Sequence, residues 1–414
     1  MFSVLRNPAY RTLFSAQVIA LIGTGLLTVA LGLLAFDLAG AAAGAVLGTA
    51  LTIKMVAYVG VAPIITAVIA RLPKKAVLIG ADVIRALVAL ALPFITDVWH
   101  IYLLVFVLQA ASATFTPAFQ SLIPVVLPNE REYTKALSLS RLAYDLEALV
   151  SPIVAAVLLT VITYNSLFVG TIVGFVGSAI FVLHTRLPEM ITTTPVGNVW
   201  HRTTIGVRLF VATPSLRFLM IMNLTVGAGT ALVLVNTVVF ARDVFALNDS
   251  ALALALACYG AGSLIVAMNV PRLINRWGDR TIMLTGSTIC ALALLVAIPM
   301  AIFAPYWAEV WWLLLGLWLM IGAGNSLITT PSGRLLARAA TDSTRGFIYT
   351  AQFSLSHACF LITYPLAGWL GVISLPAASS ALFLIAAGST IAARTMWRRS
   401  SENTDPEATV LTVS

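Results

Sequence analysis

The chain has 414 residues, of which 60% are hydrophobic and only 10% are charged. A typical soluble domain is about 45–50% apolar and about 25% charged, so this composition excludes a water-soluble globular fold. The formal net charge of +8 would suit a nucleic-acid partner only if the basic residues clustered on one solvated face, and here they are scattered between apolar runs.

The apolar residues form repeated runs bounded by glycine, proline or charge. Each run is roughly 18–25 residues long, enough to cross a hydrocarbon core as a helix, which satisfies its own backbone hydrogen bonds. The first run lacks a small-residue cleavage site, so we expect a retained span and not a signal peptide. The sequence predicts twelve spans: 13–37, 44–70, 76–96, 98–123, 136–162, 165–185, 215–241, 250–274, 281–303, 310–333, 346–369 and 374–396.

Proline positions predict that the chain is built from two similar halves. Pro117 and Pro152 in the fourth and fifth spans match Pro331 and Pro365 in the tenth and eleventh. Parallel repeats of this kind are a transporter architecture with its substrate site near the membrane midplane. We therefore expect an all-α membrane protein of twelve transmembrane helices in two pseudo-symmetric six-helix bundles: residues 1–186 and 215–399, with a cytoplasmic linker at 187–214 and a disordered cytoplasmic tail at 400–414.

The basic residues predict the orientation in the membrane. With both termini in the cytoplasm, almost all of the 24 lysines and arginines fall on the cytoplasmic face. Only Arg242 falls on the other side, and Lys54, Arg85 and Arg141 lie within spans. By the positive-inside rule we expect a monomeric, multi-pass protein of the cell inner membrane, in contact with the lipid bilayer.

The three cysteines, Cys258, Cys290 and Cys359, lie inside apolar runs without metal-ligand spacing. They predict neither a disulfide framework nor a metal site, and we expect no cofactor. An intramembrane enzyme would need a nucleophile with its base, or a metal cluster, and the sequence shows neither. We therefore expect that the protein is not an enzyme.

Two motifs connect the sequence to a known family. Residues 66–75 read Thr-Ala-Val-Ile-Ala-Arg-Leu-Pro-Lys-Lys, where a signature loop has the form Gly-x-x-x-Asp-Arg-x-Gly-Arg-Arg. Residues 115–124, residues 136–141 and the pair Ser151-Pro152 resemble the branch containing siderophore, drug and nickel-resistance efflux proteins. From about residue 7 to residue 397 the chain thus resembles the major facilitator superfamily, which implies alternating access. The fifth span lacks the glycines of the Gly-Pro-x-x-Gly-Gly element that this resemblance associates with antiport.

Charged residues near the cytoplasmic turns form a candidate latch between helices. Basic side chains there can cap the carbonyl groups that end the second span and pair with an acid on a neighbouring helix, contacts that break when the halves rock. Alternatively they only set the topology and meet anionic lipid headgroups. The candidates are Arg71, Lys74, Lys75, the i, i+3 pair Asp82 and Arg85, and, after the eighth span, Arg276, Asp279 and Arg280.

Polar side chains form one stripe on each of four spans. In the fourth span, four of them fall within an arc of about 80° at about 100° per residue. The first, seventh and tenth spans carry similar stripes, and the resemblance places the first and fourth helices of each half around a central cavity. Such stripes alternatively bind helices to one another. The candidate lining residues are Gln17, Thr24, Thr28, Gln109, Ser112, Thr116, Gln120, Asn223, Thr230, Asn325 and Thr329.

Charges inside the spans are candidates for proton coupling, since burying each costs about 2.5–3.5 kcal/mol on insertion scales. In the fifth span, Arg141 and Asp145 are four residues apart and are expected to pair with each other. Glu147 lies on another side of that helix, roughly 16 Å from its start, without a cation on its own face. We expect Glu147 to be the main coupling residue, with a paired structural glutamate as the alternative.

Two further candidates lie in other spans. Lys54 stands alone in the second span with Tyr58 one turn further on, and is expected to balance Glu147 or an anionic substrate. A structural ion pair with an acid of the fifth span is the alternative. His357 is the only histidine well inside a span; it is a possible proton shuttle or a packing residue.

Together these features predict a proton-coupled secondary exporter of small organic molecules. The neutral amides and hydroxyls of the stripes suit an amphipathic or weakly charged substrate. The alternative within transporters is a divalent-metal exporter of the nickel-resistance type, although no carboxylate-histidine cluster is present. The alternative of another class is a non-transporting membrane receptor or sensor.

The orientation can be tested with single cysteines in the linker and the tail. Asn198→Cys and Asn403→Cys should each react with a membrane-impermeant thiol reagent only after the cells are opened, because the basic residues place both segments in the cytoplasm. Labelling of either variant in intact cells would reverse the predicted topology.

Overall fold

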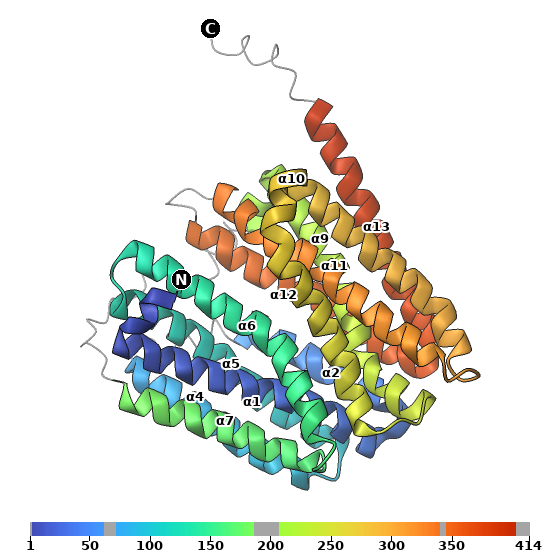
Figure 1. Ribbon diagram of the computed structural model, residues 1–414, viewed down its shortest axis with the longest axis horizontal. Coiled ribbons are helices and arrows are strands. Elements are labelled where there is room, and N and C mark those ends of the chain that lie inside the picture. The colour runs from blue at the N-terminus through green and yellow to red at the C-terminus, as the bar shows by residue number, and fades with distance from the viewer. Residues whose placement is uncertain (1, 62–71, 186–206, 340–344, 403–414) are drawn as a thin grey trace.

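The computed structural model of the chain describes residues 2–61, 72–185, 207–339 and 345–402, and every regular element in these ranges is a helix (Figure 1). The longer helices are α1 (Pro8–Ala39), α2 (Ala43–Val56), α4 (Lys74–Ala91), α5 (Val98–Val126), α6 (Glu130–Leu158), α7 (Asn165–His184), α9 (Pro214–Val238), α10 (Asp249–Phe303), α11 (Val310–Ala339), α12 (Arg345–Ile373) and α13 (Leu375–Glu402). Short helical segments are η1 (Phe2–Arg6), η2 (Gly40–Ala42), η3 (Ala57–Val61), η5 (Leu92–Phe94) and η6 (Val239–Val244), of which η3 and η6 are π-helical.

Local capping explains where several helices begin. Asn7 precedes α1, and its side-chain oxygen accepts hydrogen bonds from the backbone N–H groups of Ala9 and Tyr10 at 3.0 and 3.1 Å. Pro8 occupies the first position of that helix, where its missing N–H is not needed. Asn248 caps α10 in the same way, accepting from the backbone of Ala251 at 3.1 Å.

Ten stretches of the described residues are long and apolar enough to cross a membrane. The stretch Pro8–Gly60 contains both α1 and α2, which only the three residues of η2 separate. Helix α10 contributes two stretches, Asp249–Val270 and Arg272–Phe303, and within the second one Gly278 adopts a non-helical φ of +75°. Helix α6, whose sequence carries charged residues as far as Glu147, is not among the ten. The all-helical membrane fold is confirmed, while length and composition alone give ten spans and not twelve.

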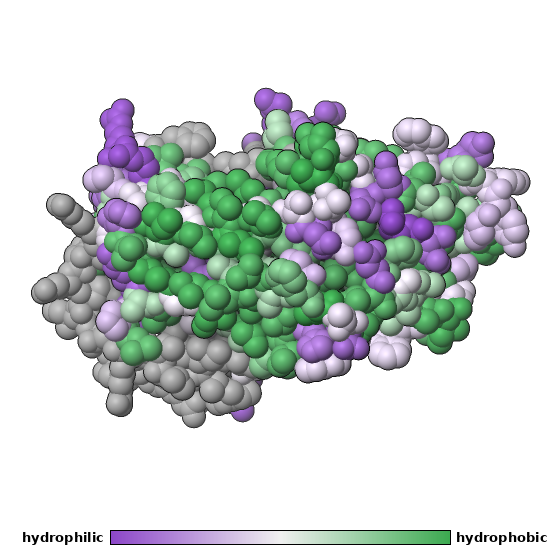
Figure 2. All heavy atoms as spheres, turned by 90° about the horizontal axis from the view of Figure 1, so that it is seen from below, coloured by the Kyte–Doolittle hydropathy of each residue, from purple (hydrophilic) through white to green (hydrophobic). Residues whose placement is uncertain are grey.

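The outer surface is apolar, as a lipid-facing surface requires. Large side chains such as Val161 and Ile373 are 80% and 78% exposed, and hydrophobic residues cover much of the face seen in Figure 2. Such surface would be unstable in water but matches lipid tails.

The helices pack in two sets that follow chain order (Figure 1). Helices α1, α2, α4, α5, α6 and α7 form the first set, in which α2 packs on α1 and α5. Helices α9, α10, α11, α12 and α13 form the second set. The two sets meet chiefly where α2 packs on α12 and where α6 packs on α10.

Glycines bring α2 and α12 into close backbone contact. A Cβ atom added to Gly48 would lie 2.7 Å from the carbonyl oxygen of Tyr364, and one added to Gly368 would lie 2.6 Å from the carbonyl oxygen of Gly44. The side-chain amide of Asn236 on α9 donates to the carbonyl oxygen of Ala367 at 3.1 Å. Small residues therefore allow the two sets to approach where α2 begins and α12 ends, which we call the glycine end.

Polar contacts reinforce the glycine end. Arg242 in η6 pairs with Asp249 at 2.9 Å, and its guanidinium lies 5.5 Å from the ring centre of Phe36 on α1. Beside it, the Tyr164 hydroxyl donates to the Asp37 carboxylate at 2.5 Å. Arg242 is the one arginine that the sequence predicts on the side opposite the cytoplasm. By stacking on Phe36 of α1 it connects the two helix sets at this end.

Enlarging Gly48 tests this contact. Gly48→Val should push α2 away from α12 and lower the stability of the purified protein by about 1–3 kcal/mol, because its side chain meets backbone atoms that cannot yield. Thermal unfolding measures the effect. Gly316→Val on α11 is the matched control, since a Cβ atom there meets nothing within 4 Å. Equal melting temperatures for the two variants would show that the glycine contact is not tight.

Candidate functional site

The predicted polar stripes of the first helix set are accessible. Thr28 and Gln120 are exposed, and Thr24, Gln109, Ser112 and Thr116 are partly exposed. The hydroxyls of Thr24 and Thr28 donate to backbone carbonyls one turn earlier on α1, at 2.9 and 3.1 Å. Their oxygens therefore remain available as acceptors, and the surface they form is polar but uncharged.

Gln17, at the start of the α1 stripe, is buried in a network between helices. Its side-chain oxygen accepts a hydrogen bond from Ser140 of α6 at 3.0 Å. Tyr144, also on α6, is hydrogen-bonded to both Gln17 and Thr116. This network joins α1, α5 and α6, and Tyr144 is a member that the stripe pattern did not reveal.

In the second helix set, most predicted lining residues are buried. The amide of Asn325 on α11 donates to the Thr230 hydroxyl at 3.0 Å and to the Tyr259 hydroxyl at 3.1 Å. Asn223 donates to Gln352 of α12 at 3.5 Å, while Thr329 is partly exposed. Buried hydrogen bonds here join α9, α10, α11 and α12, which is the alternative role of a polar stripe. A lining role for these residues stays a prediction.

The intramembrane charges form a cluster at the meeting of the two sets. Glu147 on α6 and Lys54 on α2 interact electrostatically, and both are partly exposed. Gly25 of α1 allows α6 to come near, since a Cβ atom there would lie 3.2 Å from a Glu147 carboxylate oxygen. The carboxylate therefore lies against α1, and its positive partner comes from a different helix.

Tyr58 extends this cluster to the second helix set. The Lys54 ammonium lies 5.7 Å from the centre of the Tyr58 ring, which packs edge-on against the His357 ring of α12 at 5.5 Å. The Nδ1 atom of His357 is 2.7 Å from the carbonyl oxygen of Phe353. An Nδ1–H would donate to that carbonyl and leave Nε2 available. Glu147, Lys54, Tyr58 and His357 are hereafter the charge cluster.

Two of the proton-coupling candidates cannot be placed in the cluster. The side chains of Arg141 and Asp145 lie outside the described part of the structure, so their expected pairing stays a prediction. Tyr58 was not among the predicted site residues, although its position one turn after Lys54 was the available signal.

The first-half latch residues bind neighbouring helices. Arg85 and Asp82 of α4 form a buried ion pair, and the Arg85 guanidinium lies 4.4 and 4.5 Å from the ring centres of Phe115 and Phe175. The pair thus ties α4 to α5 and α7. Arg71 lies outside the described residues, and Lys74 is partly exposed.

Lys75 contacts the end of another helix. Its ammonium donates to the carbonyl oxygen of Thr185 at 3.0 Å, just beyond the end of α7. Lys75 therefore caps α7, against which α4 packs directly. The end of the second span lies outside the described residues, so the cap expected there stays a prediction.

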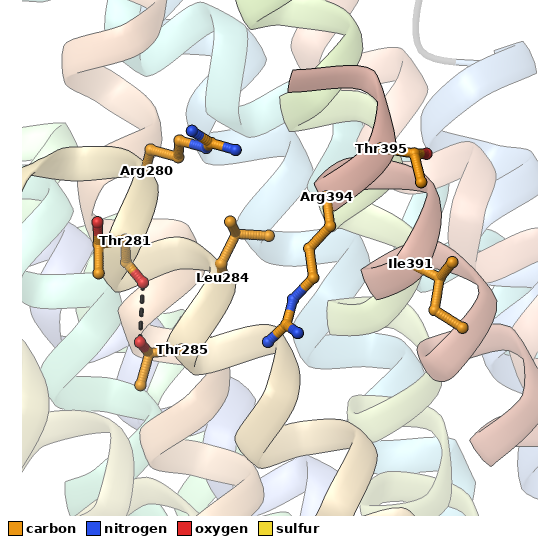
Figure 3. A pocket seen from close by; sticks show the side chains of 7 residues that line it. All are labelled: Arg280, Thr281, Leu284, Thr285, Ile391, Arg394 and Thr395. Carbon is orange, nitrogen blue, oxygen red and sulfur yellow. Dashed lines mark hydrogen bonds between the residues drawn. The ribbon is translucent and has the colours of Figure 1, made fainter. Parts of the chain in front are cut away.

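In the second half, the ion pairs of the candidate latch centre on Asp279. This residue follows the Gly278 turn and is bound by Arg338 at 2.9 Å and Arg334 at 3.5 Å, both from α11. Arg276 stacks on Trp277 at 5.6 Å, and Arg280 faces a groove between α10 and α13 (Figure 3). The sequence indicated Asp279 but not its two partners, which lie four residues apart on a helix distant in sequence.

Among the described residues, no group of three or more histidine, cysteine or acidic side chains is placed to hold a metal ion. Cys258, Cys290 and Cys359 are free thiols.

Comparison with known proteins places this arrangement in a family. The family model of the Major Facilitator Superfamily matches residues 13–308 and 219–411. The chain is 27% identical over 186 residues to Macrolide efflux protein A of Streptococcus pyogenes, covering 44% of this chain and 45% of that protein. It is 29% identical over 154 residues to the protein of that name from Enterococcus faecalis, covering 35% of this chain and 47% of the relative. The chain thus spans less than half the length of these curated relatives.

Solved structures share the fold over nearly the whole chain. The nucleoside transporter NupG, as a D323A mutant, has a TM-score of 0.68 at 13% identity, covering 94% of this chain and 100% of that one. A POT family transporter in complex with a thioalcohol-conjugated peptide gives 0.72 at 10% identity, covering 95% and 96%. A bacterial homologue of the human lysosomal transporter Spinster, inward-facing and unoccupied, gives 0.67 at 14% identity, covering 95% and 98%.

Cysteine labelling distinguishes an aqueous lining from helix packing. In a background without the native cysteines, Thr28→Cys and Gln109→Cys should react rapidly with a small polar thiol reagent, because these positions are accessible. Asn325→Cys and Gln17→Cys should react slowly, because both positions are buried. Equal rates at all four positions would contradict this division of the stripes.

Proposed function

Because this chain belongs to the Major Facilitator Superfamily, we propose that it is a proton-coupled exporter that moves small organic molecules out of the cytoplasm by alternating access. The family consists of membrane transporters and not enzymes, so the chain is a multi-pass transporter of small molecules. The direction, the driving ion and the substrate class are the proposed parts.

Export is favoured by the curated relatives, which are named for macrolide efflux. The accessible stripe residues offer hydroxyls and amides. Glu147 of α6 supplies a carboxylate close to Gly25, which lies on α1 between Thr24 and Thr28. This combination suits an amphipathic molecule with several hydroxyl groups and a weakly basic centre, the chemistry of a macrolide. It does not suit a phosphate ester, whose charge would need a surplus of cations.

Twelve crossings in two halves follow if two features are combined. Helices α1 and α2 cross separately within Pro8–Gly60, and α6 crosses although its charges lower its hydropathy. The ten stretches then become twelve, arranged as residues 1–186 and 215–399 around the linker 187–214. Both termini and the tail 400–414 lie on the cytoplasmic side of the inner membrane, because the basic residues gather there.

The charge cluster is the observation that carries proton coupling. Lys54 on α2 interacts with Glu147 on α6 and lies near Tyr58, whose ring contacts His357 on α12. When Glu147 takes up a proton, Lys54 loses its compensating charge in a region of low dielectric, and the arrangement that pairs them is no longer favoured. Because α12 belongs to the other helix set, this local change biases how the two sets pack.

The central test is transport by Glu147→Gln in proteoliposomes with an imposed proton gradient. The amide keeps the shape of the protonated acid, so gradient-driven uphill movement of a macrolide should be abolished while binding and exchange at equal concentrations persist. Glu132→Gln is the control, because it removes an exposed carboxylate from the same helix.

Uphill transport by Glu147→Gln at the unmutated rate would reject Glu147 as the coupling residue. If the unmutated protein moves macrolides only down their gradient, the proton-driven mechanism fails. Absence of any flux would favour a receptor or sensor.

A further inference from the structure

Ring-bearing side chains follow one another along one face of α12. Phe353, His357, Phe360 and Tyr364 stand at positions i, i+4, i+7 and i+11 of this helix. At about 100° per residue they fall within an arc of about 60°, and at about 1.5 Å per residue they extend over about 16 Å. These residues are hereafter the aromatic stripe. The sequence had singled out only His357 among them, as a proton shuttle or a packing residue.

The rings of the aromatic stripe form a continuous surface. The ring centres of Phe353 and His357 are 4.2 Å apart, those of His357 and Phe360 are 6.4 Å apart, and those of Phe360 and Tyr364 are 5.0 Å apart. Tyr58, in the π-helical segment η3 that continues α2, adds a ring from the other helix set. Its centre lies 6.2 Å from that of Phe353.

The aromatic stripe faces the first helix set and not the lipid. Tyr58 contacts it from η3, and the Tyr364 backbone lies against Gly48 of α2 at the glycine end. Ile362 and Trp369 of α12 lie about 180° and 160° around the helix from Phe353, and they are 53% and 60% exposed. The lipid-facing side of α12 is therefore the opposite one. The aromatic stripe lies where the two helix sets meet, as a substrate site of this architecture does.

Exposure falls steadily along the aromatic stripe. Phe353 is 44% exposed, His357 and Phe360 are partly exposed, and Tyr364 is only 4% exposed. The buried end is the glycine end, where α2 and α12 are in backbone contact. An exposed ring gains free energy when another apolar surface covers it, by about 25 cal/mol for each Å² removed from water. Phe353 and Phe360 thus offer apolar surface to a molecule that enters between the helix sets.

The charge cluster limits what this surface can bind. His357 belongs to both groups, and the Lys54 ammonium lies 5.7 Å from the ring centre of Tyr58. A ring system that itself carried a positive charge would be repelled by Lys54 at this position. The chemistry of the aromatic stripe therefore suits an uncharged apolar ring.

We propose that the aromatic stripe binds the uncharged apolar ring of the transported molecule, while the hydroxyls and amides of α1 and α5 bind its polar groups. This inference rests on the proposed export of amphipathic molecules and names the side chains that recognise their apolar part. A macrolide has this form, because its large lactone ring has apolar faces and its sugars are polar. Phe353 and Phe360 then determine specificity, since their rings provide the accessible apolar surface.

The test measures equilibrium binding of radiolabelled erythromycin, a macrolide, to the purified full-length protein in lipid nanodiscs, without a proton gradient. Phe353→Ala and Phe360→Ala should each weaken binding about 10-fold, because each loses the contact of one ring. Phe353→Tyr keeps the ring and should bind like the unmutated protein. Trp369→Ala is the matched control, because it removes a more exposed ring from the opposite face of the same helix, and it should leave binding unchanged.

The remaining outcomes separate this inference from its alternatives. Unchanged binding in both phenylalanine-to-alanine variants would overturn it. Equally weakened binding in Phe353→Tyr would assign the aromatic stripe to packing between the helix sets and would also overturn it, as would a lack of erythromycin binding by the unmutated protein. Ring-dependent binding by a protein that does not pump erythromycin in a proton gradient would reject the proposed coupling and support the aromatic stripe as the binding surface.

Discussion

Close helix contact without a hydrophobic driving force is the constraint on which this fold depends. Lipid tails are as apolar as leucine side chains, so transmembrane helices associate through van der Waals packing and hydrogen bonds. The glycine end shows this directly, because Gly48 and Gly368 bring the backbones of α2 and α12 together. The hydrogen bond from Asn236 to Ala367 adds a polar contact at the same end. These contacts hold one end of the two helix sets together, and the alternating access that we propose requires that they be able to separate.

The free-energy cost of burying a charge in the membrane explains how the ionisable side chains inside the helices are arranged. Asp82 and Arg85 satisfy each other on one helix, and two aromatic rings enclose the guanidinium, so this pair is structural packing within one set. Glu147 and Lys54 come from different helices, and Lys54 also approaches Tyr58, whose ring contacts α12. A pair divided between two helices is sensitive to how those helices are arranged, whereas a pair on one helix is not. This difference makes the charge cluster the better candidate for coupling.

The polar stripes illustrate how one pattern supports two structural roles. On α1 and α5, several stripe residues remain accessible and keep acceptor oxygens. On α9 and α11, Thr230 and Asn325 are buried, because Tyr259 of α10 packs against both and completes their hydrogen bonds. Helical spacing places polar side chains on one face in both cases. Which helix covers that face depends on residues far away in the sequence.

The sequence by itself determined the helical membrane fold, since long apolar runs have no other way to satisfy their backbone in lipid. It also determined the pairing of Asp82 with Arg85, because three residues on a helix fix their separation. Only the tertiary structure decided that Lys75 caps α7, that Arg334 and Arg338 bind Asp279, and that Tyr58 links Lys54 to His357. These contacts join helices whose order in space is set by packing. Local periodicity gives the direction of a side chain on its own helix, but not the neighbour that it meets.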